Sequence, residues 1–305
     1  MKFRRLIARF IVFSFALALL LVVAFRVWPV SFFHAIMYWQ EHEAGASSFY
    51  RNVDGHRVHY LEEGPQSGRP LLLIHGLTGS TEDWRNLAPS FSKAGFHVYM
   101  LDLLGFGRTD QPADFSYSVH DQAEFVVHFM DAVGLRNADI AGWSMGGGIA
   151  QHIAFRHPDR VRRLILLDSV GIYELPNWDT GLFTPETPAQ LEAINRLLQP
   201  GLPPVPAFIA HDMIRRSRKN AWVTHRALNS LFTGDDATDK ILPQLKLPVL
   251  IVWGDQDVMT PYHQADAMQR LLPNSERITA KGCGHLAPVL CTDRIAPGMV
   301  AFLQK

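Results

Sequence analysis

Ser144 is the residue whose surroundings most clearly indicate chemistry. It lies in Gly-Trp-Ser-Met-Gly, residues 142–146, between a strand-like run (138–141) and a helix-like stretch (147–157). A serine hydroxyl is a weak nucleophile until a base takes its proton and the backbone presents it. Glycines on both sides of Ser144 favour a sharp turn from strand to helix that leaves the hydroxyl exposed. The segment predicts a nucleophilic serine.

Two later segments offer an acid and a base. The apolar run 248–253 is typical of a buried parallel strand, and Asp255 and Asp257 follow it in one loop. Asp168 ends another strand-like run and is a reserve candidate for the acid. After a last strand (275–280) comes Lys-Gly-Cys-Gly-His, a pliable loop that can turn His285 inward. We predict that His285 is the base that activates Ser144.

Acyl transfer also needs two amides that point at the developing negative charge. We predict that Met145, the residue after the nucleophile, supplies one of them. Leu77 supplies the other, from the loop His-Gly-Leu-Thr-Gly (75–79) that follows a strand-like run at 69–74. His75 begins this loop, and we interpret it as a brace that holds the loop by hydrogen bonds, because a general base must reach the nucleophile.

From about His56 to its end, the chain resembles the α/β-hydrolase superfamily. The order serine, acid, histidine is the one found in that superfamily. The matching pieces are His75-Gly76, Asp102-Leu-Leu-Gly-Phe-Gly107, Gly142-Trp-Ser-Met-Gly146, Trp253-Gly-Asp-Gln-Asp257 and Gly284-His285. The resemblance implies a doubly wound, mostly parallel, eight-stranded α/β sheet with a helical cap. Its Trp-Gly-x-x-Asp-x-x-x-Pro pattern favours Asp257 as the acid and leaves Asp255 to structure the loop.

Within the superfamily, the chain is most similar to membrane-anchored monoacylglycerol lipases and related bacterial lipases and esterases. This likeness rests on three features that occur together in the chain: an N-terminal anchor, the pattern Trp-Gly-x-Gln-Asp and the pattern Cys-Gly-His. It implies a serine hydrolase that cleaves monoacylglycerol or other lipid esters and needs neither metal nor organic cofactor. Two alternatives stay open: a C–C bond hydrolase acting on ring-cleavage products, and a hydrolase-fold protein that only binds a lipid or a partner.

The N-terminus predicts a single-pass membrane anchor. Residues 10–25 are uncharged, and the extended run 6–27 would span ~33 Å as a helix, about the thickness of a bilayer core. We expect this helix to end or kink near Trp28, because Pro29 follows. A cleaved signal peptide is the alternative, but no small-x-small site follows closely. Basic residues precede the run, which places the enzyme outside the cytoplasm, in a bacterium on the periplasmic side of the inner membrane.

The 305 residues carry no net charge, which gives no indication of a nucleic-acid partner. We predict an anchor (1–29), a linker or interfacial segment (30–55), a hydrolase core (56–170 and 241–305) and a cap insertion (171–240). Other strands are expected at 57–62 and 97–101, with a helix at 119–133. The cap is expected to form helices at 188–198, 207–217 and 221–231. Its apolar residues are Ile172, Leu182, Phe183, Ile194, Leu197, Leu198, Phe208, Ile209 and Met213.

Two cysteines, Cys283 and Cys291, leave a choice open. They are close enough in sequence to form a disulfide in an oxidising compartment. The preferred interpretation is that Cys283 fills its loop as an unpaired small residue.

Overall fold

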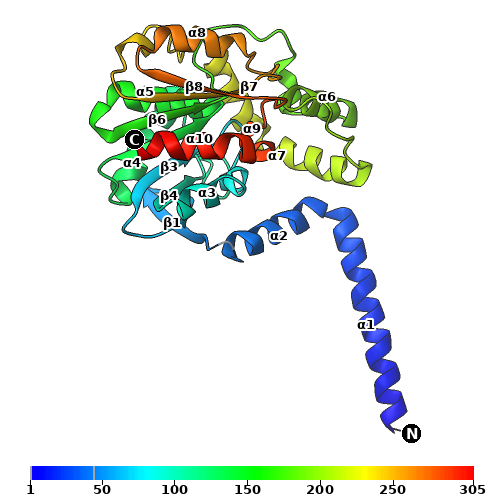
Figure 1. Cartoon of the computed structure of the whole chain (residues 1–305). Helices are drawn as coiled ribbons and strands as arrows, with labels where there is room; N and C mark the ends of the chain where they lie inside the picture. The colour runs from blue at the N-terminus through cyan, green and yellow to red at the C-terminus, as the bar shows by residue number, and fades with distance from the viewer. Residues whose placement is uncertain (1, 44) are drawn as a thin grey trace.

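A helical arm leads into the α/β body of the chain, in a computed structural model that describes residues 2–43 and 45–305. Helix α1 (Lys2–Val27) projects away from the α/β body, whereas α2 (Pro29–Glu43) runs alongside the body (Figure 1). The break between the two helices confirms the predicted end near Trp28. Within α1, the stretch Arg9–Val27 is long and apolar enough to cross a membrane, and none of it is buried.

Eight strands form one sheet in the order β1-β2-β4-β3-β5-β6-β7-β8. All neighbours from β4 to β8 are parallel, while β1 and β2 pair antiparallel at one edge. The strands are β1 (Ser47–Val53), β2 (His56–Glu63), β3 (Arg69–Ile74), β4 (Phe96–Leu101), β5 (Ala138–Trp143), β6 (Val161–Leu167), β7 (Val249–Gly254) and β8 (Ser275–Ala280). The predicted doubly wound, mostly parallel sheet is confirmed.

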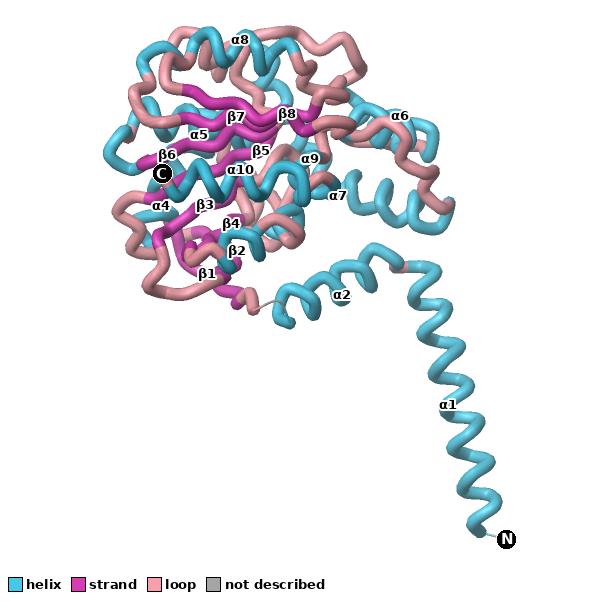
Figure 2. The backbone as a smooth tube through the Cα atoms, viewed as in Figure 1, coloured by secondary structure: helices cyan, strands magenta, loops and turns pink. Residues whose placement is uncertain are grey.

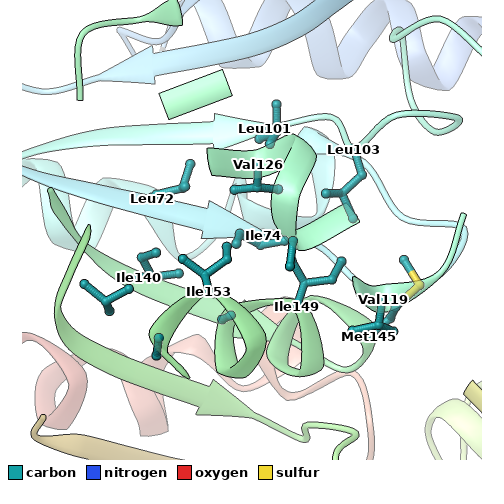
Figure 3. Packing of buried hydrophobic residues seen from close by; sticks show 14 of the residues in the cluster. Leu72, Ile74, Leu101, Leu103, Val119, Val126, Ile140, Met145, Ile149 and Ile153 are labelled. Atoms are coloured by element: carbon teal, nitrogen blue, oxygen red, sulfur yellow. The ribbon is translucent and has the colours of Figure 1, made fainter. Parts of the chain in front are cut away.

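Helices cover both faces of this sheet (Figure 2). Successive strand residues point to opposite faces, so Leu72 and Ile74 join one core and Leu71 and Leu73 the other. The first core packs under α4 (Val119–Ala132), α5 (Met145–Arg156) and α8 (His263–Leu271), and Figure 3 shows Ile149 of α5 beside Ile74. The second core packs under α3 (Ala88–Lys93), α9 (Ala287–Leu290) and α10 (Thr292–Gln304). Burial on both faces explains why these strands are continuous apolar runs.

Strand β1 lies within the segment that the sequence predicts to be a linker or interfacial helix. It pairs with β2 from Ser47 opposite Glu62 to Val53 opposite His56. Asp54 and Gly55 form the turn between the two strands, both with positive φ (52° and 87°). An Asp-Gly pair is a preferred two-residue hairpin turn, because its backbone twist matches that of the strands.

Between β6 and β7 the chain leaves the sheet and forms α6 (Pro188–Leu198) and α7 (Ala207–Thr233). Helix α6 has the predicted bounds. The two helices predicted at 207–217 and 221–231 are wrong, because they join into one 27-residue helix. The residues between them, Arg218, Lys219 and Asn220, include no proline or glycine that would end a helix.

Candidate active site

Ser144 is held in an unfavourable backbone conformation between β5 and α5. Its φ and ψ are 54° and −119°, a region that residues with a side chain rarely adopt. Trp143 ends the strand and Met145 begins the helix, so the serine stands alone at the turn. The strand-to-helix turn is the one that the sequence predicts, but Ser144 is buried and lines two cavities, so its hydroxyl is not exposed on the surface.

The glycines around Ser144 serve close approach, and neither of them has a positive φ. A Cβ on Gly142 would lie 2.2 Å from the carbonyl oxygen of Gly146. A Cβ on Gly146 would lie 2.1 Å from the carbonyl oxygen of Ile74. The physical reason for these glycines therefore differs from the expected one: they let α5 press against β5 and β3, while Ser144 itself takes the strained dihedrals.

His285 and Asp257 come together in the interior, on the loops after β8 and β7. The Nδ1–H of His285 donates to Oδ2 of Asp257 over 2.8 Å, and both side chains are buried. Trp143 holds the backbone at His285, because its indole N–H donates to the His285 carbonyl oxygen over 2.9 Å. The predicted acid and base are therefore adjacent, with the imidazole held in one orientation.

Thr260 is a part of this arrangement that sequence reasoning missed. Its hydroxyl donates to Oδ2 of Asp257 over 2.7 Å, and its amide donates to Oδ1 over 3.0 Å. The Met259 amide donates to the same Oδ1 over 2.8 Å. Three donors besides His285 therefore hold the carboxylate in place. A threonine three residues after Asp257 fits the pattern of a side chain that bonds back to its own turn.

The loop 75–79 packs directly against the nucleophile. A Cβ on Gly76 would lie 3.1 Å from the Cβ of Ser144, so only glycine fits there comfortably. Leu77 and Ser144 line the same two cavities. Neither the Leu77 amide nor the Met145 amide donates a hydrogen bond to another residue in the described part of the chain. Both N–H groups near Ser144 are therefore open to an outside acceptor.

His75 has the bracing geometry that we predict for it. The Leu103 amide donates to its Nε2 over 3.0 Å, so Nδ1 carries the proton and donates to the Gly76 carbonyl oxygen over 2.7 Å. Burial lowers the pKa of His75, and the nearby charge of Asp102 only partly opposes this. The ring is therefore neutral, with both nitrogens engaged by the loops it joins.

The two other candidate acids have different surroundings. Asp255 accepts from the Gly282 amide over 2.7 Å, which ties the acid loop to the histidine loop as expected of a loop-structuring residue. Asp168 is fully buried and accepts from the Gly254 amide over 2.7 Å, while its Oδ2 has no partner among the described residues. Burial and then the neighbouring charge of Asp257 raise the pKa of Asp168 well above its usual range. A protonated Asp168 is a poor partner for an imidazolium.

Cys283 and Cys291 form a disulfide, so the preferred interpretation of Cys283 as an unpaired loop filler is wrong. The bridge encloses His285 and helix α9 in one short covalent loop. Cys283 is fully buried and its carbonyl oxygen accepts from the Gln256 amide over 2.9 Å. The histidine loop is therefore fixed both covalently and to the acid loop.

Two adjoining cavities meet at Ser144. The larger, about 830 Å³, also contains His285 and Trp143, and the smaller, about 80 Å³, lies under the segment after β6. Of the predicted cap residues, those that line either cavity are Ile172, Leu182, Phe183, Ile194, Leu198 and Met213. Residues Val30, His34, Ala35 and Tyr38 of α2 also line the larger cavity, which the sequence did not predict.

Comparison with known proteins agrees with this geometry. The family model described as alpha/beta hydrolase fold matches residues 69–203 and 209–290. Lipase 1 of Psychrobacter immobilis is 29% identical over 82% of this chain and 81% of its own length. A 2-hydroxymuconate semialdehyde hydrolase of Pseudomonas putida is 31% identical over 82% of this chain and 92% of its own.

Among solved structures, one of a membrane phospholipase A, described as a bacterial virulence factor, is similar over the full chain and 98% of its own length. Its TM-score is 0.82 and its sequence identity 29%. The likeness extends through the N-terminal arm, since all of this chain is covered. With a strained serine after β5, a matching family model and bacterial lipases among its relatives, the chain belongs to the α/β-hydrolase fold family.

Proposed function

We propose that this chain is a serine hydrolase that cleaves carboxylic esters of lipids, with Ser144 as nucleophile, His285 as base and Asp257 as acid. The observation that supports this best is the 2.8 Å bond between His285 and Asp257 in the interior that also holds the strained Ser144. Ser144 and His285 line one cavity. A hydroxyl, an imidazole and a carboxylate in this order are suited to acyl transfer.

The mechanism follows from the bonds around each residue. Asp257 keeps the proton on Nδ1 of His285, so Nε2 accepts the proton of Ser144 as its oxygen attacks the ester carbonyl. The amides of Leu77 and Met145 stabilise the oxyanion, aided by the positive N-terminal end of α5. His285 then protonates the leaving alcohol, and water cleaves the acyl-enzyme in the same way.

The substrate we propose is a monoacylglycerol or another ester with a medium or long acyl chain. The larger cavity, about 830 Å³, and its apolar cap residues favour a lipid. A lipase and a membrane phospholipase A among the similar proteins support the same class.

We further propose that α1 is an uncleaved anchor and that the body faces the periplasm. Lys2, Arg4, Arg5 and Arg9 lie before or at the start of the apolar stretch, which favours a cytoplasmic N-terminus. On this proposal, the anchor (1–29) and the segment 30–55, which contains α2 and ends in β1 of the sheet, lead to a core (56–170, 241–305) interrupted by a cap (171–240).

A C–C bond hydrolase is the second candidate, because the similar hydrolase of Pseudomonas putida bears the name of such an activity. It uses the same fold, so the fold does not separate the two. The exposed apolar α1 favours the lipid ester.

The test is covalent labelling by a fluorophosphonate probe, followed by hydrolysis of esters that differ in acyl length. We expect Ser144→Ala to abolish labelling and to lower kcat by about 10⁴-fold or more. Hydrolysis of long-chain monoacylglycerol supports the substrate; turnover of ring-cleavage products alone supports the second candidate. Labelling that persists in Ser144→Ala would contradict the assignment of the nucleophile.

A further inference from the structure

One side of the larger cavity is formed by a helix outside the hydrolase body. Val30, His34, Ala35 and Tyr38 of α2 line the cavity that contains Ser144 and His285. On a helix these four positions share one face, because the chain turns about 100° per residue. The opposite face carries Phe33, Ile36 and Trp39, which are 45%, 51% and 61% exposed. Helix α2 therefore has one face toward the site and an opposite apolar face that is about half exposed, where the guanidinium of Arg85 lies 5.8 Å from the ring of Phe33.

The N-terminal end of α2 is fixed to the cap by charged groups on α7. Asp212, whose side chain is 1% exposed, accepts from the Val30 amide over 3.0 Å. Amides in the first turn of a helix have no partner within it, so this carboxylate satisfies one of them and suits the positive helix end. Arg215 and Arg216 both pair with Asp212. We call Asp212, Arg215 and Arg216 the α7 clamp.

The clamp also holds the end of α1. Arg215 donates to the Val27 carbonyl oxygen over 3.1 Å, one of the last carbonyls of that helix. Arg216 donates to the hydroxyl of Ser31 in the first turn of α2. The rings of Phe25 and Phe208 lie 5.7 Å apart beside these bonds. The bend between α1 and α2 is thus held against α7, which lies next to α2 in Figure 1.

Farther along, α2 is fixed to the hydrolase core. His34 and Glu82 bond over 2.8 Å, and Glu82 belongs to the turn η1 (Thr81–Trp84) that follows the loop 75–79. The guanidinium of Arg108 lies 5.7 Å from the ring of Tyr38. Helix α2 therefore bridges cap and core along the side of the cavity that adjoins α1.

We propose that lipid esters enter the cavity from the bilayer on the side that α2 lines, with the exposed face of α2 in the membrane interface and the α7 clamp holding α2 in place. This rests on the proposed function. The occupant of the exposed face is the lipid surface, because α2 directly follows α1 in the chain. The stretch Arg9–Val27 of α1 is long and apolar enough to cross a membrane, which would bring α2 to the surface of that membrane. Aromatic residues at this level suit the interface.

The first test narrows the cavity from its α2 side. The full chain is reconstituted in phosphatidylcholine vesicles, and kcat/KM is measured for a long-chain monoacylglycerol in the vesicles and for a short, water-soluble nitrophenyl ester. Ala35→Trp is expected to lower the vesicle rate by about tenfold, several times more than the rate on the short ester, which needs less width. The matched control is Ala301→Trp, at an exposed alanine of α10 that lines neither cavity, with both rates within about twofold.

Equal losses on both substrates, no loss in Ala35→Trp, or an equal effect of Ala301→Trp would each overturn the entry route. None of these results affects the proposed function, which fails if the unsubstituted chain does not hydrolyse the long-chain monoacylglycerol in a Ser144-dependent way.

The second test concerns the clamp. Asp212→Ala removes the acceptor of the Val30 amide, and we expect a fall in vesicle activity of about fivefold with fluorophosphonate labelling of Ser144 retained. Asp212→Asn keeps an acceptor oxygen and should recover part of this loss. The control is Glu192→Gln, which breaks an exposed pair with Arg196 elsewhere in the cap. Unchanged vesicle activity in Asp212→Ala would overturn the role of the clamp.

Discussion

At the scale of single residues, the site depends on groups that hold the reacting ones. Asp257 accepts four hydrogen bonds, from His285, Met259 and twice from Thr260, so its charge is satisfied although it is buried. Asp168, one strand away, has an unpartnered oxygen and a raised pKa. Hydrogen bonds to a carboxylate favour its charged form, and burial without them favours the neutral one. Burial and the neighbouring charge of Asp257 raise the pKa of Asp168, and its one amide donor, from Gly254, only partly opposes them.

This difference gives a direct test of the acid. Asp257→Asn should lower kcat on a soluble ester by about 10⁴-fold, because the amide favours the wrong histidine tautomer. Asp168→Asn should lower it by less than about tenfold, since an amide resembles the neutral acid already present. Steady-state kinetics at neutral pH measure both. The reverse order of effects would move the acid to Asp168.

The central residues could be predicted because each follows a strand and lies in a glycine-containing or acidic loop. Ser144 and His285 have glycine neighbours, and Asp257 follows the apolar run of β7. Thr260 could not be assigned, because a threonine in a loop has many equivalent uses. The role of Asp168 could not be assigned either, because its side chain accepts from the Gly254 amide of β7, which lies 86 residues later in the sequence.

At the scale of elements, the sheet was predictable and its exposed edge was not. Buried parallel strands are apolar runs, but β1 is exposed along six of its seven residues and lacks that pattern. Asp54-Gly55 was the available signal for its hairpin. Helix α7 was predicted as two pieces because its polar centre interrupts the apolar stripe. The contribution of α2 to the cavity depends on contacts with α7, which no local pattern encodes.

The disulfide gives a prediction at this scale. Removing both cysteines, as Cys283→Ala with Cys291→Ala, should lower the free energy of unfolding by about 2–3 kcal/mol, the chain-entropy value for so short a loop. It should also lower kcat, because the bridge fixes the loop of His285. Chemical unfolding in detergent, followed by tryptophan fluorescence, measures the first effect.

Reductant supplies the control. It should reproduce both changes in the natural chain and leave the double variant unaffected. A natural chain with the same stability and kcat in reductant would show that the bridge contributes nothing to either.

At the scale of the whole molecule, an apolar helix extends from a body that carries the candidate site (Figure 1). The bend at Trp28–Pro29 is predictable from proline chemistry. Whether α1 is retained is a question of processing, because a signal sequence has a similar composition. The clamp on α7 favours retention, since Arg215 bonds to Val27 at the end of α1.

Retention predicts how the protein fractionates. In bacterial cells the full chain should stay in the membrane pellet after an alkaline wash, which releases peripheral proteins, and detergent should release it. Mass spectrometry of the extracted protein should find peptides from residues 10–25. A soluble periplasmic form that begins after Val27 would show that the helix is a cleaved signal.

The tight packing at Gly142 and Gly146 has a consequence for how this chain tolerates mutation. Neither glycine lines either of the two cavities at Ser144, yet any side chain there would collide with backbone only 2.1–2.2 Å away. Loss of Ser144 should leave a folded but inert protein, whereas a change at either neighbour should yield misfolded chains removed by proteases. A survey of variants by growth alone would score the three positions alike, and only measuring protein abundance would tell them apart.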